Sequence, residues 1–130
     1  MTRRITQIVI VCAVMLPGAV SAHHNMSAVY DFNDRVTLTG TLTKVNWVNP
    51  HIGLILDARR ESGRTESWHG EGPTPNFFRS RDTTKSDFDQ AIGKMLIIEV
   101  SRARDGSNSG LLRTITMPDG KVISLCPQNC

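Results

Sequence analysis

The sequence has 130 residues, of which 15 are basic and 12 are acidic. Arg3 and Arg4 lie at its start, so the rest of the chain has a net charge of 13 − 12 = +1. A nearly neutral chain with interspersed charges lacks the basic stripe of a nucleic-acid-binding domain, so we expect no nucleic-acid partner. The length is sufficient for one domain with a modest core and too short for two.

Residues 1–22 have the three parts of a secretory signal peptide in the expected order. Two arginines precede an apolar run at residues 8–16, and small residues stand before a cleavage point after Ala22. The apolar run is shorter than the roughly 20 residues that a membrane-spanning helix needs. The sequence therefore predicts a protein that begins at His23, is periplasmic or secreted, and retains no membrane anchor.

The first half of the mature chain shows the alternation that is typical of β-strands. Residues 36–48 alternate with a change of parity in the middle, which predicts a long strand that contains a bulge. Asn49-Pro50 is typical of a turn, and residues 52–56 predict a second strand that forms a hairpin with the first. A third strand is predicted over residues 65–71, where the pattern is weaker.

A helical connection is predicted after the third strand. Thr74-Pro75 is typical of a helix N-cap with proline at the first helical position, and a second helical turn is predicted around residues 86–92. Four apolar side chains are expected on the buried face of this connection: Phe77, Phe78, Phe88 and Ile92.

Two further strand regions follow. Residues 95–100 are the most apolar run of the domain and predict a central strand that is buried on both faces. The Asp-Gly turn at 118–120 lies between two apolar runs, at 111–117 and 121–125, and this arrangement predicts a closing hairpin.

The order of elements predicts a mainly β fold. Three strands, a short helical connection and two or three strands are typical of a small OB-like barrel of five to six strands, with the helical connection between the third and fourth strands. We expect the barrel over residues 36–125, an N-terminal extension at 23–35 and a Cys-x₃-Cys tail at 126–130. Other small barrels and sandwiches are the alternatives.

Two cysteines, Cys126 and Cys130, lie beyond the predicted signal peptide. In an oxidising compartment a pair this close most often forms a local disulfide, and we expect one here. A thiolate metal site is the alternative, although two thiols alone make an incomplete ligand set.

Several segments of the mature chain resemble the domain-of-unknown-function 6152 family of small exported bacterial proteins. The most specific are the paired histidines at 23–24 and the Trp-x-Asn-Pro-His stretch at 47–51. The resemblance also includes Tyr30-Asp31-Phe32, residues 36–45, Pro75-Asn76 and residues 104–108. It implies export and a small β-barrel, and it assigns no activity. The chain departs from the family pattern at residues 80–84 and in the tail at 126–130.

Four histidines are the candidate metal ligands: His23, His24, His51 and His69. After cleavage behind Ala22, the free amine and the imidazole of His23 can chelate one metal ion, and the other histidines can supply further nitrogens. Cleavage after Ser21 would leave Ala22-His23-His24 at the amino terminus, and a histidine in the third position is also an amino-terminal copper motif. Nitrogen-rich tetragonal coordination favours Cu(II), so copper is the cofactor that this hypothesis predicts. The alternative is that His23 and His24 belong to a frayed terminus, with His51 and His69 as ordinary turn and strand residues.

A second set of candidate residues borders the face of the second and third predicted strands. Trp47, Asn49 and His51 lie at the predicted hairpin corner, and Trp68 lies next to His69 on the third strand. On an OB-like barrel a ligand would lie across this face and the adjoining loops. The alternative is that both tryptophans belong to the core or the rim of the barrel.

No catalytic signature is present, because the sequence has no Gly-x-Ser-x-Gly, no His-Glu-x-x-His and no glycine-rich phosphate loop. We therefore expect a non-enzymatic exported binding module for an unknown small ligand. The alternatives are a copper-binding protein and a structural subunit of an envelope complex, which would associate with a fixed protein partner.

Overall fold

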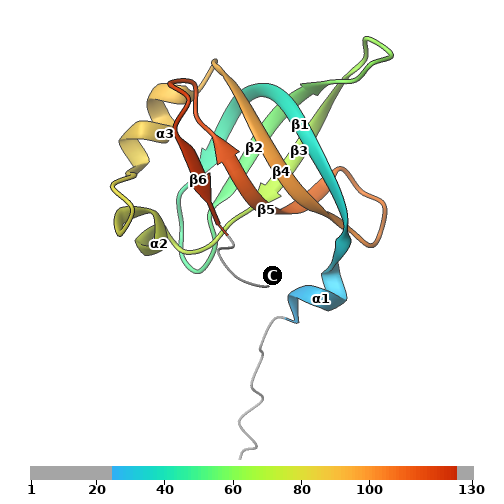
Figure 1. Ribbon diagram of the computed structural model, residues 1–130, viewed down its shortest axis with the longest axis horizontal. Helices are drawn as coiled ribbons and strands as arrows, with labels where there is room; N and C mark the ends of the chain where they lie inside the picture. The colour runs from blue at the N-terminus through green and yellow to red at the C-terminus, as the bar shows by residue number, and fades with distance from the viewer. Residues whose placement is uncertain (1–24, 126–130) are drawn as a thin grey trace, which may run out of the picture.

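The computed structural model describes residues 25–125, and within this range it contains six strands and three short helices (Figure 1). In chain order the elements are α1 Met26–Val29, β1 Tyr30–Asn46, β2 Gly53–Arg59, β3 Thr65–Glu71, α2 Pro75–Arg79, α3 Lys85–Ala91, β4 Met95–Ala103, β5 Ser109–Thr116 and β6 Val122–Ser124. The mainly β fold class is therefore confirmed. The predicted signal peptide, His23, His24, Cys126 and Cys130 lie outside the described residues.

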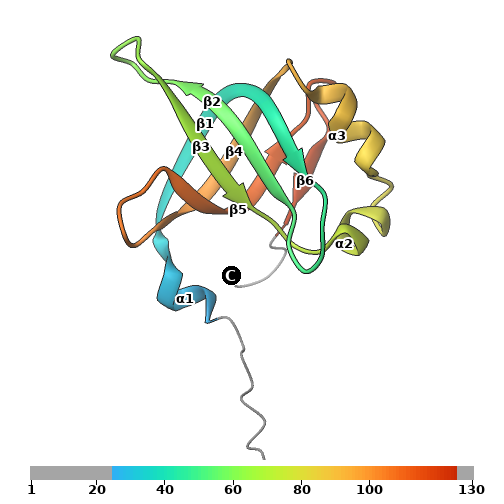
Figure 2. The same cartoon turned by 180° about the vertical axis from the view of Figure 1, so that it is seen from behind.

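The strands of the described range form one sheet in the order β3-β2-β1-β4-β5-β6, and neighbours in this order are antiparallel. In addition, the end of β3 pairs in parallel with the start of β5, with His69 opposite Ser109 and Glu71 opposite Leu111. Strands β1 to β5 are thus paired in a closed circuit, which Figures 1 and 2 show from opposite sides. The circuit brings segments that are distant in the sequence side by side.

Strand β1 is long because it pairs with β4 along its first part and with β2 along its second. A register shift against β2 between Leu42 and Lys44 is the bulge that the change of parity predicts. The strand begins at Tyr30, earlier than the predicted start at Val36, so part of the expected N-terminal extension is strand. The register against β4 is irregular between Tyr30 and Arg35 and interrupts the alternation. The sequence pattern therefore does not predict this first part of the strand.

Other predicted elements are found close to their expected bounds. Helix α2 begins at Pro75 with Thr74 as its N-cap, as the sequence predicts. The turn between β5 and β6 contains Gly120, whose φ of 89° lies in the left-handed region that favours glycine. The Asp-Gly pair therefore marks this hairpin for a physical reason.

The hydrophobic core lies between the strands of the circuit and the two helices α2 and α3, which Figure 1 shows on one side of the strands. Leu42, Leu54 and Ile98 point into it from three strands and are fully buried. Phe78 of α2 and Phe88 of α3 are also fully buried and meet edge to face, with ring centroids 5.5 Å apart. Each such side chain contributes about 1.5–3 kcal/mol through burial, so the helical connection is held to the sheet mainly by these two rings.

Two predictions about burial are wrong. The sequence places Ile92 on the buried face of the helical segment, but the residue is 44% exposed because α3 ends at Ala91. The apolar run of β4 predicts burial on both faces, but Met95 and Ile97 are exposed. Only alternate residues of β4 face the core, because successive side chains of a strand point to opposite faces of the sheet.

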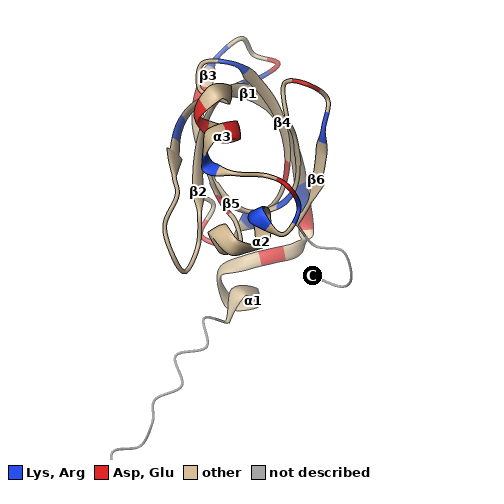
Figure 3. Ribbon diagram, turned by 90° about the vertical axis from the view of Figure 1, so that its left-hand side faces the viewer, with Lys and Arg blue, Asp and Glu red and all other residues tan. Residues whose placement is uncertain are grey.

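Basic and acidic residues are interspersed over the described surface, as Figure 3 shows for one side of the molecule. Ion pairs join Arg35 to Glu99 at 3.5 Å and Lys85 to Asp89 at 2.7 Å. Exposed pairs of this kind contribute about 0–1 kcal/mol each, so they add little to the stability of the fold. Within residues 25–125, no helix is long and apolar enough to cross a membrane.

Candidate functional site

A polar cluster of Tyr30, His51 and Glu71 lies where the starts of β1 and β2 meet the end of β3. The Tyr30 hydroxyl donates a hydrogen bond to Oε2 of Glu71. The other carboxylate oxygen of Glu71, Oε1, lies 3.8 Å from Nδ1 of His51. Glu71 therefore stands between a phenol and an imidazole that come from separate parts of the chain. We call these three residues the His51 cluster.

The backbone around His51 explains how the loop holds this side chain beside β3. The amide of Ile52 donates to the carbonyl of Pro73, and the amide of Gly72 donates to the carbonyl of Ile52, at 3.1 and 2.9 Å. These two bonds continue the ladder between β2 and β3 beyond the ends of the strands. They fix the β1–β2 loop against Gly72 and place the imidazole next to Glu71.

The hydrogen bond of His51 determines which of its nitrogens carries a proton. Nδ1 lies 3.1 Å from the carbonyl oxygen of Gly72, and a carbonyl oxygen can only accept. Nδ1 must therefore carry the hydrogen, and in the neutral ring Nε2 keeps a free lone pair. The side chain is 35% exposed, so this lone pair belongs to a ring that solvent and ligands can reach.

Tyr30 is almost completely buried, with 3% of its surface exposed. Burial, the hydrogen bond to Glu71 and the charge of Glu71 together raise the pKa of Tyr30 well above its usual value. The phenol therefore stays protonated and keeps donating to the carboxylate. Tyr30 thus orients Glu71, and Glu71 and Gly72 orient His51.

His69 lies on the exposed face of β3, and its side chain extends over Gly53 of the neighbouring strand β2. A Cβ atom added at Gly53 would lie 2.9 Å from Nε2 of His69, so the glycine leaves the room that this ring occupies. His51 and His69 are therefore on neighbouring segments, but no third ligand joins them within the described range. Among residues 25–125 there is no group of three or more His, Cys, Asp or Glu side chains that could hold a metal ion.

The predicted ligand-face residues separate into two groups. Asn49 is exposed, and His51 is partly exposed, in the β1–β2 loop. The ring of Trp47 is half-buried and packs against Phe78 and Phe88, with centroid distances of 5.4 and 5.5 Å. Trp68 is 1% exposed and belongs to the core. Both tryptophans therefore pack in or against the core, as the alternative interpretation predicts. Asn49 and His51 remain candidates for ligand contact.

The start of the described chain is fixed near the His51 cluster. The amide of Arg104, in the β4–β5 loop, donates to the carbonyl of Val29, and its Nε donates to the carbonyl of Ser27, both at 2.9 Å. Its Nη1 also lies 3.2 Å from Oδ2 of Asp31. Helix α1 is thereby held to the β4–β5 loop, and Tyr30 follows it directly.

Two residues of the cluster, Tyr30 and Glu71, are not among the predicted site residues. Tyr30 stands before the regular alternation of β1, and Glu71 is a partly buried acidic residue at the end of β3 with no motif around it. The sequence offers one indication of Glu71: it ends a predicted strand, and the hairpin pairing would bring that end beside the loop that carries His51. The pairing of Gly53 with Glu71 makes this proximity visible, and it requires knowledge of the strand register.

Comparison with known proteins adds the family of the chain. The model of a family of unknown function, DUF6152, matches residues 10–113, a range that includes the whole His51 cluster. The chain belongs to this family. The resemblance found in the sequence is confirmed, and membership of DUF6152 brings no assigned activity with it. Comparisons with curated proteins and with solved structures gave no match.

Proposed function

We propose that this member of DUF6152 is an exported, non-enzymatic binding protein with an OB-like barrel, and that its ligand binds at the His51 cluster. The closed circuit of β1 to β5 and the helices between β3 and β4 support the OB-like part, since they follow the OB order of elements. OB barrels bind ligands on the face of their second and third strands and at the loops after the first and fourth strands. Figures 1 and 2 show both loops in the lower half of the molecule, the β1–β2 loop beside α2 and the β4–β5 loop beside α1.

The His51 cluster lies where these parts meet. His51 belongs to the loop after β1, and Glu71 is the last residue of β3. The loop after β4 is joined to β3 by a hydrogen bond from the amide of His69 to the carbonyl of Asn108, at 2.9 Å. A ligand at this end would therefore contact the β1–β2 loop and β3 together, with the β4–β5 loop beside them.

The observation that carries the proposal is the fixed tautomer of His51. Because Gly72 accepts from Nδ1, the ring offers a lone pair at Nε2 without having to reorient first. Ligand binding to a group that is already ordered costs less conformational entropy than binding to a mobile one. The described partners of the ring are a carbonyl and a carboxylate and include no hydroxyl or thiol nucleophile. The arrangement therefore favours binding over nucleophilic catalysis.

Native mass spectrometry of the exported protein tests the proposal. We expect the wild-type protein to retain a non-covalent small-molecule or metal adduct, because the site is formed before the ligand arrives. His51→Ala should lose this adduct, whereas the control Gln90→Ala, on the exposed face of α3, should keep it. A wild-type protein without any adduct, or an adduct that survives His51→Ala, would contradict the proposal. An adduct with the mass of a protein would instead support the envelope-subunit alternative.

Copper binding is the second candidate function, and one observation favours it. Metal-binding histidines usually donate their second ring nitrogen to a carbonyl or a carboxylate, and Nδ1 of His51 has both kinds of group beside it. His24 directly precedes the described chain, whose first helix is held to the same end of the molecule. In this proposal His23 and His24 supply the first nitrogens and His51 completes the copper site.

Titration with Cu(II) distinguishes this candidate from an organic ligand. We expect one copper ion per chain, and its loss on combined His23→Ala and His24→Ala substitution. Glu71→Gln should weaken binding by about 10–100-fold, the usual effect of removing an outer-shell partner of a metal-binding histidine. Gln90→Ala, on the exposed face of α3, is the control and should leave the affinity unchanged. Equal copper affinity in the wild type and in the His51→Ala variant would exclude His51 as a ligand.

A further inference from the structure

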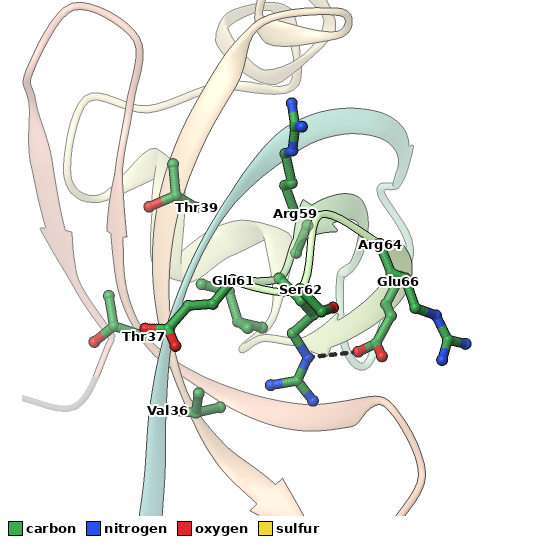
Figure 4. A pocket seen from close by; sticks show the side chains of 11 residues that line it. Val36, Thr37, Thr39, Arg59, Glu61, Ser62, Arg64 and Glu66 are labelled. Carbon is green, nitrogen blue, oxygen red and sulfur yellow. Dashed lines mark hydrogen bonds and ion pairs between the residues drawn. The ribbon is translucent and has the colours of Figure 1, made fainter.

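A hollow of about 420 Å³ lies under the hairpin that joins β2 to β3, at the other end of these strands from the His51 cluster (Figure 4). Leu38 of β1 and Ala58 of β2, both buried, contribute to its apolar lining. Its charged lining residues are Arg59, Arg60, Glu61, Arg64 and Glu66. The hollow therefore combines a small apolar surface with a charged rim.

The indole of Trp68 lies beside Arg60, which is one of the residues that line this hollow. The guanidinium carbons of Arg60 and Arg102 each lie 5.8 Å from the ring centroid. The Nε1 atom is buried and makes no hydrogen bond of normal geometry. Because Nε1 is buried, a ligand in the hollow affects the indole through Arg60 and does not contact the nitrogen itself.

Glu66 shows on which side the indole donor lies. Nε of Arg60 donates to Oε2 of Glu66 at 2.7 Å, and this bond is drawn in Figure 4. The Arg60 hydrogen bond, with a smaller contribution from the Trp68 indole, holds the pKa of Glu66 below its usual value. The indole N–H is thus close to a side chain that lines the hollow.

The charges of the hollow favour a ligand with a negative group. Three arginines and two glutamates line it, which leaves an excess charge of 3 − 2 = +1. Within the described residues, the side chain of Arg60 uses only Nε in a hydrogen bond, so Nη1 and Nη2 are free to donate. Two parallel N–H donors of one guanidinium match the two oxygens of a carboxylate.

We infer that this hollow binds a small carboxylate-bearing ligand, which is separate from any ligand of the His51 cluster. The terminal nitrogens of Arg60 hold the carboxylate, and the Trp68 ring lies beside the same guanidinium. Arg59 and Arg64 stand at the rim and raise the local positive potential. The apolar part of the ligand lies against Leu38 and Ala58.

The indole N–H resonances of ¹⁵N-labelled protein test this inference. The sequence contains two tryptophans, so Trp68→Phe assigns the two signals. Acetate and citrate are the probes, with chloride and inorganic phosphate at equal ionic strength as comparisons. We expect a saturable shift of the Trp68 signal with the carboxylates and none of that size with chloride or phosphate. The Trp47 signal, from the other end of the molecule's strands, serves as an internal reference.

Variants of Arg60 show whether the shift reports the proposed contact. Arg60→Gln should weaken carboxylate binding about tenfold or more, because it removes a charge-assisted hydrogen bond. Arg60→Lys keeps the charge but loses the two-fold contact and should be intermediate, while Arg79→Gln on α2 should behave as the wild type. The rest of the spectrum shows that each variant is folded. A Trp68 signal that does not saturate, that responds equally to phosphate or chloride, or that shifts unchanged in Arg60→Gln would overturn the inference.

Discussion

At the scale of single residues, Tyr30 connects the N-terminal end of the described chain to the candidate site. Its hydroxyl donates to Glu71 although the ring is nearly completely buried. Ionisation of this phenol would place a second negative charge beside the carboxylate in a poorly hydrated position, which burial and charge repulsion both oppose. The hydrogen bond therefore depends on a neutral tyrosine.

The pH dependence of stability tests this role of Tyr30. Its folded pKa is raised above the unfolded value of about 10, so its contribution is complete below about pH 10 and decreases as the pH rises further. Tyr30 is the only tyrosine of the sequence, so near-ultraviolet absorbance follows its ionisation directly. We expect it to ionise only together with unfolding, and Tyr30→Phe to reduce the alkaline loss of stability. Ionisation of the folded protein near pH 10 would contradict this description.

The sequence identified part of the site at this scale and missed the rest. His51 was recognised because it follows an Asn-Pro turn in a distinctive segment, whereas Glu71 has no such local mark. Trp68 is a candidate that the sequence suggests and the structure places in the core. The alternation in β3 does not show whether the face that carries Trp68 is exposed or buried. Side-chain direction became clear only from the pairing of Trp68 with buried Leu56.

At the scale of the elements, the closure of the strand circuit depends on a close approach of β3 and β5. Gly70 and Gly110 face each other in the parallel pairing of these strands. A Cβ atom at Gly70 would lie 2.8 Å from Leu112, and one at Gly110 would lie 2.7 Å from Val100. A larger residue at Gly70 would displace the Leu112 side chain of β5, and one at Gly110 would require β4 and β5 to shift apart.

Substitution of Gly110 tests the packing of β5 against β4 at the point where the circuit closes. We expect Gly110→Ala to lower the free energy of unfolding by about 1–3 kcal/mol, the usual cost of overpacking a close-packed position. Urea unfolding followed by tryptophan fluorescence measures the change, and Asn108→Ala in the exposed loop before β5 is the control. A variant as stable as the wild type would show that β4 and β5 accommodate the extra methyl group without cost.

The elements themselves were largely accessible from the sequence. The bulge in β1, Pro75 at the start of α2 and the Asp-Gly turn each have a local cause that their residue types reveal. The parallel pairing of β3 with β5 has none, because it joins residues on opposite sides of the helical connection. The exposure of Ile97 was missed for a related reason, since an apolar run alone does not show which face of a strand is covered.

At the scale of the whole molecule, the two ends of β2 and β3 carry different chemistry. One end has the His51 cluster, which offers a lone pair and a carboxylate. The other has the arginine-lined hollow, which offers hydrogen-bond donors. Ligands of opposite character would therefore bind at opposite ends of the same strands, and each site can be changed without touching the other.

The protonation of His51 at Nδ1 can be measured by long-range ¹H–¹⁵N NMR of the imidazole nitrogens. In the ligand-free protein with a neutral imidazole, we expect the His51 signals of a ring protonated at Nδ1 with an unprotonated Nε2. A ring protonated at Nε2, or one that exchanges freely between both forms, would contradict this protonation and remove the main support for a binding site at this cluster.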